Sequence, residues 1–301
     1  MSQALHESLR ALLGQRALFG EPMSRHTTWK VGGPAWCLCR VHSQREALAV
    51  IHAANKHGRP WKALGGGSNL LVADQGYPGV LLRLGGSLAG WSQDQDDLLV
   101  GAGLYLATVV KHSARLGLKG LEWAAGIPGT LGGAVANNAG AHQGQMSDLT
   151  QELTLLSQAR EIVRIKGGEA PAGYRRRELP AGSLILAARL RLAPSRPEAV
   201  ISAIGQNLAR RRQSQPLGRA TAGSVFKNPP GDFAGRLIEA AGLKGLAVGP
   251  AVVSQLHANF IENRGGASAA QVLELMELVR RRVAESFGVE LEPEVEVLGH
   301  A

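Results

Sequence analysis

Cysteine is nearly absent from this sequence, which excludes a fold stapled by disulfides. Of 301 residues, only Cys37 and Cys39 are cysteines. Residues two apart on one strand are poorly placed to form a disulfide with each other. Two cysteines alone also make a weak metal site, and none of the 9 histidines is spaced with carboxylates as metal ligands are. We therefore expect buried thiols, a reducing compartment and no catalytic metal.

Aromatic residues and long apolar runs are also scarce. Aromatic residues make up 4% of the chain, which is thin for a surface that stacks on nucleic-acid bases. No run of 18 apolar residues occurs, so we expect no membrane-spanning segment. The first twenty residues lack the continuous apolar segment of a signal peptide. These features predict a cytoplasmic protein without a nucleic-acid or membrane partner, and we expect a monomer.

Positive charge and glycine are abundant instead. Lys and Arg total 33 against 24 Asp and Glu, a formal net charge of +9, which favours an anionic partner such as a phosphorylated small molecule. The 39 glycines are about twice the average usage and are clustered rather than periodic. Clustered glycine predicts backbone brought close to a ligand.

The apolar patterning predicts an α+β chain. Helical spacing is expected at 1–20, 43–58, 104–116, 198–212 and 268–288, where Ser43 with Glu46 and Ser268 with Gln271 have the spacing of capping boxes. Strands are expected at 30–42, 79–84, 97–102, 152–156, 160–165, 183–192 and 294–298. The order lacks the regular alternation of a doubly wound sheet. A joint at Pro194–Pro197 predicts two domains, 1–195 and 196–301.

The first glycine cluster, 64–72, runs from one apolar strand to another. Three consecutive glycines would let several N–H groups approach a pyrophosphate, to which Ser68 and Asn69 add side-chain donors. The cluster lacks the G-x-G-x-x-G of a Rossmann fold and the Lys-Ser/Thr of a P-loop. Taken alone, it is equally consistent with a tight turn between strands.

The second cluster, 126–140, places five glycines and one proline in 15 residues. Such a path can line a flat ligand without interference from side chains, although by itself it could also serve packing. Two clusters about 60 residues apart, both following apolar segments, favour one extended ligand shared between them.

These two clusters resemble the cofactor signature of the vanillyl-alcohol-oxidase-type (PCMH-like) FAD-binding fold. Within it, the chain resembles the UDP-N-acetylenolpyruvoylglucosamine reductase family, in the shorter class that lacks an extra substrate-covering insertion. The supporting strings run along almost the whole chain: 26–35, 173–175, 222–229, 234–239, 257–260 and 291–295.

The resemblance implies a smaller α+β substrate-binding domain after the FAD-binding region, with the last strand returning Glu294 to the active site. It also implies FAD as cofactor, NADPH as co-substrate and a UDP-sugar enolpyruvyl ether as substrate. The FAD-binding residues that it implies are Gly65, Gly66, Gly67, Ser68, Asn69, Leu70, Gly126, Ile127, Pro128, Gly129, Thr130, Gly132, Gly133, Ala134, Asn138, Ala139 and Gly140.

Three residues carry the chemistry in this comparison. Ser224 is the implied proton donor, Arg175 grips the developing enolate through its guanidinium, and Glu294 is the acidic partner. Arg177 stands where the family usually carries serine. The implied substrate-binding residues are Tyr174, Lys227, Asn228, Arg236 and His257. From the residues alone, Ser224 could be a turn serine, Arg175 part of a surface basic run, and Glu294 a surface glutamate.

Two other functions remain open. A different FAD-linked oxidase or dehydrogenase of the same fold would keep both glycine clusters without needing Arg175, Ser224 and Glu294 together. A basic, non-enzymatic nucleotide-binding protein would instead explain the charge, and it would be colourless and bind nucleic acid with a steep salt dependence.

Overall fold

The computed structural model describes residues 2–141 and 144–299, and the chain forms two compact units. Unit 1 contains residues up to 19, 37–66 and 79–210, and unit 2 contains 20–36, 67–78 and 211–301. Each unit has its own apolar core. The expected division at residue 195 concerns functional domains and stays a prediction, whereas the compact units are built from interleaved segments of the chain.

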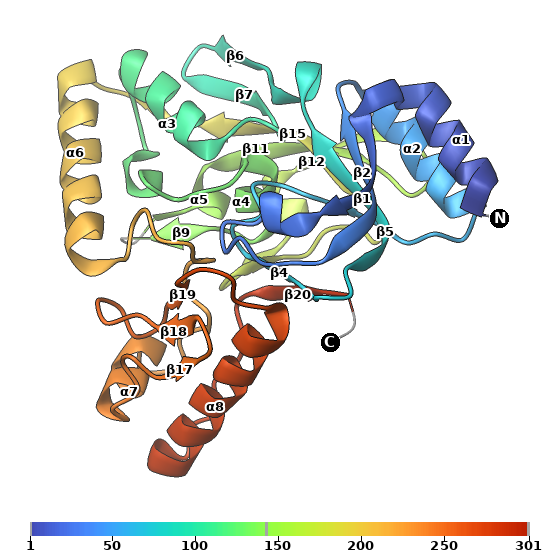
Figure 1. The fold of residues 1–301 in the computed structure, drawn as a ribbon. Coiled ribbons are helices and arrows are strands. Elements are labelled where there is room, and N and C mark those ends of the chain that lie inside the picture. Colours follow the sequence, from blue (N-terminus) through green and yellow to red (C-terminus); the bar gives the residue numbers. More distant parts are fainter. Residues whose placement is uncertain (1, 142–143, 300–301) are drawn as a thin grey trace. The chain divides into compact units, whose positions relative to one another are not determined.

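Unit 1 begins with helix α1 (Ser2–Leu13), which lies beside α2 (Gln44–Lys56) (Figure 1). The Ser43 hydroxyl accepts a hydrogen bond from the Glu46 N–H (3.2 Å) and caps α2, and Gly58 follows its end at φ +63°. A four-stranded sheet with the order β1-β2-β5-β3 follows, most of whose residues belong to unit 1. Its strands are β1 (Ala17–Pro22), β2 (Pro34–Val41), β5 (Tyr77–Leu84) and β3 (Trp61–Ala63). Cys37 and Cys39 on β2 are buried, free thiols, as predicted.

The main sheet of unit 1 is antiparallel, in the order β12-β11-β15-β7-β6. Its strands are β12 (Ile162–Lys166), β11 (Thr150–Leu156), β15 (Leu184–Arg191), β7 (Asp97–Gly101) and β6 (Trp91–Asp94). The buried residues of this sheet share one core with α3 (Leu106–Arg115) and α4 (Leu131–Ala136). The strands predicted at 97–102, 152–156, 160–165 and 183–192 are therefore confirmed within a few residues.

Short elements complete unit 1. They are β8 (Leu118–Lys119) paired with β16 (Ala193–Pro194), β9 (Gly140–Ala141) paired with β10 (Gly144–Gln145), α5 (Met146–Leu149), and the hairpin β13 (Ala172–Gly173)–β14 (Arg176–Arg177). Helix α6 (Pro197–Ser214) runs from unit 1 into unit 2. The helix expected at 198–212 is present, but its apolar residues do not all face a core, because Val200 is buried and Ile201 is 55% exposed.

Unit 2 combines an early segment of the chain with its last third. Strand β4 (Leu70–Val72) pairs in parallel with β20 (Glu296–Leu298), and β17 (Ala247–Val248), β18 (Ala251–Val253) and β19 (Ile261–Asn263) form a second sheet. The indole N–H of Trp29 donates to the Ile261 carbonyl (2.7 Å), and Asn263 Nδ2 donates to the Trp29 carbonyl (2.9 Å). The final strand is shorter than predicted, because β20 begins at Glu296 and Glu294 lies before it. Within this strand Val297 is 38% exposed.

Two helices cover the unit 2 core, α7 (Ala234–Ala240) and α8 (Ala269–Phe287). The predicted capping box of α8 is present, with Ser268 accepting from Gln271 N–H, and Gly288 ends the helix at φ +66°. The Asp74 carboxylate also accepts from the N–H groups of Ala269 and Ala270 (2.8 and 2.9 Å), where an anion suits the helix dipole.

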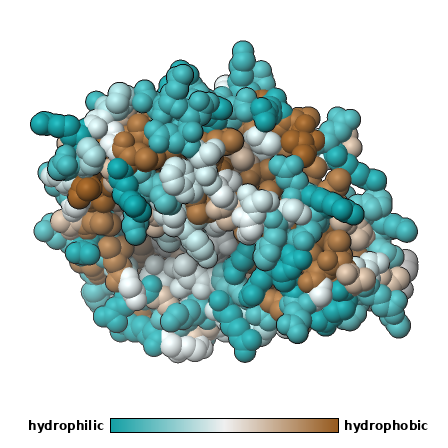
Figure 2. Space-filling model, turned by 90° about the horizontal axis from the view of Figure 1, so that it is seen from above, coloured by the Kyte–Doolittle hydropathy of each residue, from teal (hydrophilic) through white to brown (hydrophobic). Residues whose placement is uncertain are grey.

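The surface carries no single large apolar area on the face shown in Figure 2, where apolar side chains appear in separate groups among hydrophilic ones. Among the helices within residues 2–141 and 144–299, none is long and apolar enough to cross a bilayer.

Candidate active site

The two glycine clusters lie against each other in unit 1. A Cβ at Gly66 would come within 2.7 Å of the Gly129 Cα, and a Cβ at Gly65 within 2.8 Å of Thr130 Oγ1. The second cluster is fixed in turn to the start of α3, because Leu106 N–H donates to the Gly129 carbonyl (3.0 Å). The glycines therefore serve close packing of backbone on backbone, in addition to any ligand that they approach.

The clusters also offer hydrogen-bond donors. In the described part of the chain, the N–H groups of Gly65, Gly66 and Gly129 donate no hydrogen bond to the protein. Helix α4 begins within the second cluster, capped by Thr130, whose Oγ1 accepts from the Gly133 N–H (3.4 Å). Unpaired N–H groups at glycine-rich turns suit the pyrophosphate of a dinucleotide, so these residues fit FAD.

In unit 2 the first cluster continues into residues that meet the last part of the chain. Gly67 has φ +63°, and a Cβ there would fall 2.0 Å from the His26 carbonyl oxygen. The Asn69 side chain donates to the Glu294 carbonyl (3.1 Å), and Glu296 N–H donates to the Asn69 carbonyl (3.1 Å). The predicted cofactor residue Asn69 is thus bonded to the backbone of the predicted catalytic Glu294.

Arg175 stands in the two-residue turn of the β13–β14 hairpin. Its backbone has φ +57°, which is uncommon for a residue other than glycine. Its guanidinium lies 5.0 Å from the Tyr174 ring centre, and its Nη1 is 3.3 Å from the point where a Cβ on Gly140 would lie. The hairpin therefore presents a cation beside the end of the second glycine cluster.

Arg177 lies buried at the base of the same hairpin. It pairs with Ala172 across the hairpin, is 8% exposed, and its Nη1 donates to the carbonyls of Gly167 and Ala170 (3.2 and 3.3 Å). Burial lowers the pKa of this guanidinium. A serine could not reach these two carbonyls, so in this chain Arg177 fastens the base of the hairpin.

Ser224 and Glu294 come from two segments that pair in unit 2. Glu294 N–H donates to the Val225 carbonyl (2.8 Å), and Phe226 forms a β-bridge with Pro293. Gly223 has φ +78°, as expected of the glycine before Ser224. Both Ser224 and Glu294 are half-buried. The segments that carry these two predicted catalytic residues are therefore paired, while Arg175 belongs to unit 1.

Asn259 fixes the Ser224 segment, a role that the sequence does not predict. It is 3% exposed, its Oδ1 accepts from the Phe226 N–H (2.9 Å) and its Nδ2 donates to the Phe226 carbonyl (2.8 Å). Its own carbonyl accepts from the Val225 N–H (2.9 Å). The only signal in the sequence was its place in the string 257–260.

The predicted substrate-binding residues of unit 2 are differently placed. Lys227 forms an ion pair with Glu292, and Arg236 forms one with Asp232, which holds the pKa of Asp232 at about 2. Asn228 Oδ1 accepts from the Ala234 N–H (3.1 Å) at the start of α7. His257 packs on Phe260 at 4.7 Å, and burial lowers its pKa. The structure gives these side chains partners in the protein and leaves their contacts with substrate as predictions.

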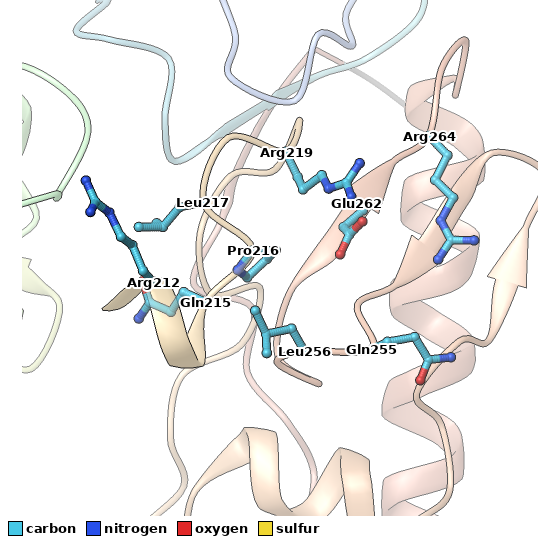
Figure 3. A pocket seen from close by; sticks show the side chains of 9 residues that line it. All are labelled: Arg212, Gln215, Pro216, Leu217, Arg219, Gln255, Leu256, Glu262 and Arg264. Atoms are coloured by element: carbon cyan, nitrogen blue, oxygen red, sulfur yellow. The ribbon is translucent and has the colours of Figure 1, made fainter. Parts of the chain in front are cut away.

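A basic pocket of about 400 Å³ lies in unit 2 (Figure 3). Three arginines and one carboxylate line it, together with polar and apolar residues: Arg212, Arg219, Arg264, Glu262, Gln215, Gln255, Pro216, Leu217 and Leu256. Figure 3 shows Arg212 and Arg264 at opposite ends. The excess of positive charge suits an anion carrying about two negative charges. The sequence alone does not indicate this pocket, because its lining residues come from segments that are far apart in the chain.

Comparison with known proteins identifies the chain. The model of the UDP-N-acetylenolpyruvoylglucosamine reductase C-terminal domain matches residues 215–298, and an FAD binding domain model matches 35–166. UDP-N-acetylenolpyruvoylglucosamine reductase from Heliobacterium modesticaldum is 45% identical over 281 residues, 93% of this chain and 90% of that protein. The chain belongs to the UDP-N-acetylenolpyruvoylglucosamine reductase family.

Other members extend the match. A UDP-N-acetylenolpyruvoylglucosamine reductase from Symbiobacterium thermophilum is 44% identical over 98% of this chain and 96% of its own. The crystal structure of the Thermus caldophilus enzyme is similar with a TM-score of 0.82 at 39% identity, covering 93% of this chain and 98% of that one. The predicted family and the FAD-binding fold are confirmed, and the protein is an FAD-dependent oxidoreductase of this family.

Proposed function

We propose that this protein reduces UDP-N-acetylglucosamine enolpyruvate to UDP-N-acetylmuramate with NADPH, through FAD, in peptidoglycan precursor synthesis. The observation that carries the proposal is the match to reductases of this name along 93–98% of the chain. The paired Ser224 and Glu294 segments and the Arg175 turn supply the groups that such a reaction needs.

Bound FAD would supply hydride transfer from NADPH to the terminal methylene carbon of the enolpyruvyl ether. Negative charge then develops on the adjacent carbon and its carboxylate. The Arg175 guanidinium can hold both carboxylate oxygens through two N–H groups, which favours this charged state over the neutral alkene.

Ser224 then donates its hydroxyl proton to the carbon next to the carboxylate, completing the lactyl ether. A serine hydroxyl is a weak acid, but a carbanion beside a carboxylate is basic enough to take its proton. The β-bridge between Phe226 and Pro293 and the bond from Glu294 N–H to the Val225 carbonyl pair the two segments, which supports a role for Glu294 beside this serine. Glu294 serves as the acidic partner that polarises the intermediate.

The phosphates of the UDP group bind in the basic pocket of unit 2. A nucleoside diphosphate carries about two negative charges. The three arginines of the pocket offset the charge of Glu262 and leave enough positive charge to neutralise those phosphates: Arg212, Arg219 and Arg264. Lys227 and Asn228 contact the sugar part, with Tyr174, Arg236 and His257 as further substrate contacts.

The enzyme works as a cytoplasmic monomer without a nucleic-acid or membrane partner. Two buried free thiols support a reducing compartment. By supplying the precursor of peptidoglycan, it supports cell-wall biogenesis and so cell shape, division and the cell cycle.

The decisive experiment is NADPH oxidation by the purified yellow protein with and without UDP-N-acetylglucosamine enolpyruvate. We expect rapid oxidation that depends on the enolpyruvyl ether and stops when that ether is exhausted. NADPH oxidation that is indifferent to the ether would refute the proposal and leave another flavin enzyme of the same fold.

The pocket is tested separately by Arg219→Ala. We expect KM for the UDP-sugar to rise about tenfold, the loss of one good charge contact of about 1.4 kcal/mol, while flavin reduction by NADPH is unchanged. Arg282→Ala on the exposed side of α8 is the matched control. An unchanged KM would move the phosphates out of this pocket.

A further inference from the structure

Asn138 lies at the end of the second glycine cluster with every hydrogen-bonding group of its amide in use. It is 1% exposed. Its Nδ2 donates to the Gly173 carbonyl (3.0 Å) and to Gln145 Oε1 (3.1 Å), and its Oδ1 accepts from the Ser147 N–H (2.8 Å). An amide has two N–H donors and one carbonyl, so no side-chain donor remains for FAD, which only the backbone of Asn138 can contact.

The bond to Gly173 connects the glycine cluster to the turn that carries Arg175. Gly173 is the last residue of β13, and the turn Tyr174–Arg175 follows it directly. Because Arg175 has φ +57°, its turn needs support from outside the hairpin to hold that backbone. A two-residue hairpin whose strands have two residues each has little stability of its own.

A second contact runs between the same two segments. Arg175 Nη1 lies 3.3 Å from the Cβ position of Gly140, two residues after Asn138. The segment 138–140 therefore supports the hairpin at its backbone through Asn138 and accommodates the guanidinium at Gly140. The left-handed backbone of Asn138 itself, φ +41°, aims its side chain out of the cluster, and asparagine tolerates this conformation better than most residues.

We propose that Asn138 is a positioning residue that sets the Arg175 guanidinium and couples it to the glycine cluster that holds FAD. The proposal rests on the function given above, in which Arg175 acts on the substrate carboxylate. Since Asn138 acts through Arg175, its loss affects transfer from reduced flavin to the substrate and not the reduction of flavin by NADPH.

The test uses Asn138→Asp in the holoenzyme. This variant keeps the size of the side chain, an acceptor for the Ser147 N–H and tolerance of the left-handed backbone, but the ionised side chain cannot donate to the Gly173 carbonyl. Asn137→Ala is the matched control, because Asn137 is exposed and its Nδ2 bonds only to the Gly133 carbonyl of its own helix.

Stopped-flow absorbance separates the two half-reactions. We expect Asn138→Asp to slow reoxidation of the reduced enzyme by the enolpyruvyl substrate about tenfold to a hundredfold, the cost of a catalytic group displaced by about 1 Å, and to leave reduction by NADPH within about twofold. Asn137→Ala should match the wild type in both steps. Equal slowing of both steps in Asn138→Asp would overturn the proposal.

A double-mutant cycle tests whether the effect passes through Arg175. In an Arg175→Lys background, Asn138→Asp should add little further loss; a fully additive loss would overturn the proposal. Hydrogen exchange gives a readout without turnover: amides of 172–177 should exchange faster in Asn138→Asp and not in Asn137→Ala, and unchanged exchange would also overturn it. If the wild type does not turn over the substrate but the exchange result holds, the proposed function fails while the structural coupling stands.

Discussion

Two buried asparagines hold the two halves of the candidate catalytic set in different ways. In unit 2, Asn259 bonds to both the N–H and the carbonyl of Phe226, as a neighbouring strand would. In unit 1, Asn138 bonds to three separate residues and holds the Arg175 turn at one carbonyl. The serine segment is thus fixed by strand-like pairing on both of its sides, whereas the arginine turn depends on single side-chain bonds. The arginine should be the easier of the two to displace without unfolding.

The largest expected effect comes from removing the chemistry on the unit 2 side. Ser224→Ala should lower the rate of substrate reduction by about 10²–10⁴-fold, the usual contribution of a general acid, because the intermediate then lacks its proton donor. Flavin reduction by NADPH should be intact in single-turnover absorbance measurements. If substrate reduction survives in this variant, Ser224 is not the proton donor, and the serine segment of unit 2 is not part of the catalytic set.

Removing the unit 2 support should cost fold stability as well as activity. Asn259→Ala leaves the buried N–H and carbonyl of Phe226 unpaired, which should lower the free energy of unfolding by about 2–6 kcal/mol, at about 1–3 kcal/mol for each group. For the same loss of activity, Asn138→Asp should lower the free energy of unfolding less than Asn259→Ala does. Urea unfolding of both variants measures this, with Asn137→Ala at an exposed position as the control. If the ratio of stability loss to activity loss is the same in Asn259→Ala and Asn138→Asp, the two asparagines do not hold their segments in different ways.

Two glycine-to-alanine substitutions test the packing of the glycine clusters, because one should cause a steric clash and the other only backbone strain. Gly66→Ala in unit 1 should collide with Gly129 and weaken FAD binding about tenfold or more, because the clusters must separate. Gly223→Ala in unit 2 meets no atom within 4 Å and should cost only about 1–2 kcal/mol of backbone strain, with FAD affinity unchanged. Gly168→Ala, which also has free space, is the control. FAD titration reads the outcome, and retention of FAD by Gly66→Ala would contradict the packing argument.

The smallest effect concerns pH and unit 2 alone. Burial lowers the pKa of His257 below its usual 6.5, so the fold favours the neutral ring. The stability from this site is present above pH 6.5 and is lost as the pH falls toward the lowered pKa. His257→Gln should flatten the dependence of unfolding free energy on pH between 7 and 5. The exposed His52→Gln should leave the wild-type slope, and an equally steep profile in His257→Gln would refute the assignment.

The sequence predicted what is local and repeated. The capping residues Ser43 and Ser268, the helix ends near 58 and 288, and the main-sheet strands follow from short-range patterns, and the structure confirms them. The pairing of the Ser224 and Glu294 segments could be suspected only through the family resemblance. The roles of Asn138 and Asn259, the basic pocket and the exposure of Ile201 depend on contacts between distant residues, which spacing along the chain does not encode.

The bond from Trp29 to Ile261 spans 232 residues, and unit 2 is assembled from three separated segments. A ribosome needs roughly 10–50 s to add that much chain, at 5–20 residues per second. During this interval the core of unit 2 is incomplete, so three of its early residues lack most of their packing partners: Trp29, Val31 and Leu71. Unit 1 can gather most of its main sheet earlier, so assembly of the Ser224–Glu294 pair is a late event that follows synthesis of β20. The order of synthesis thereby delays catalytic competence until the last strand has joined β4.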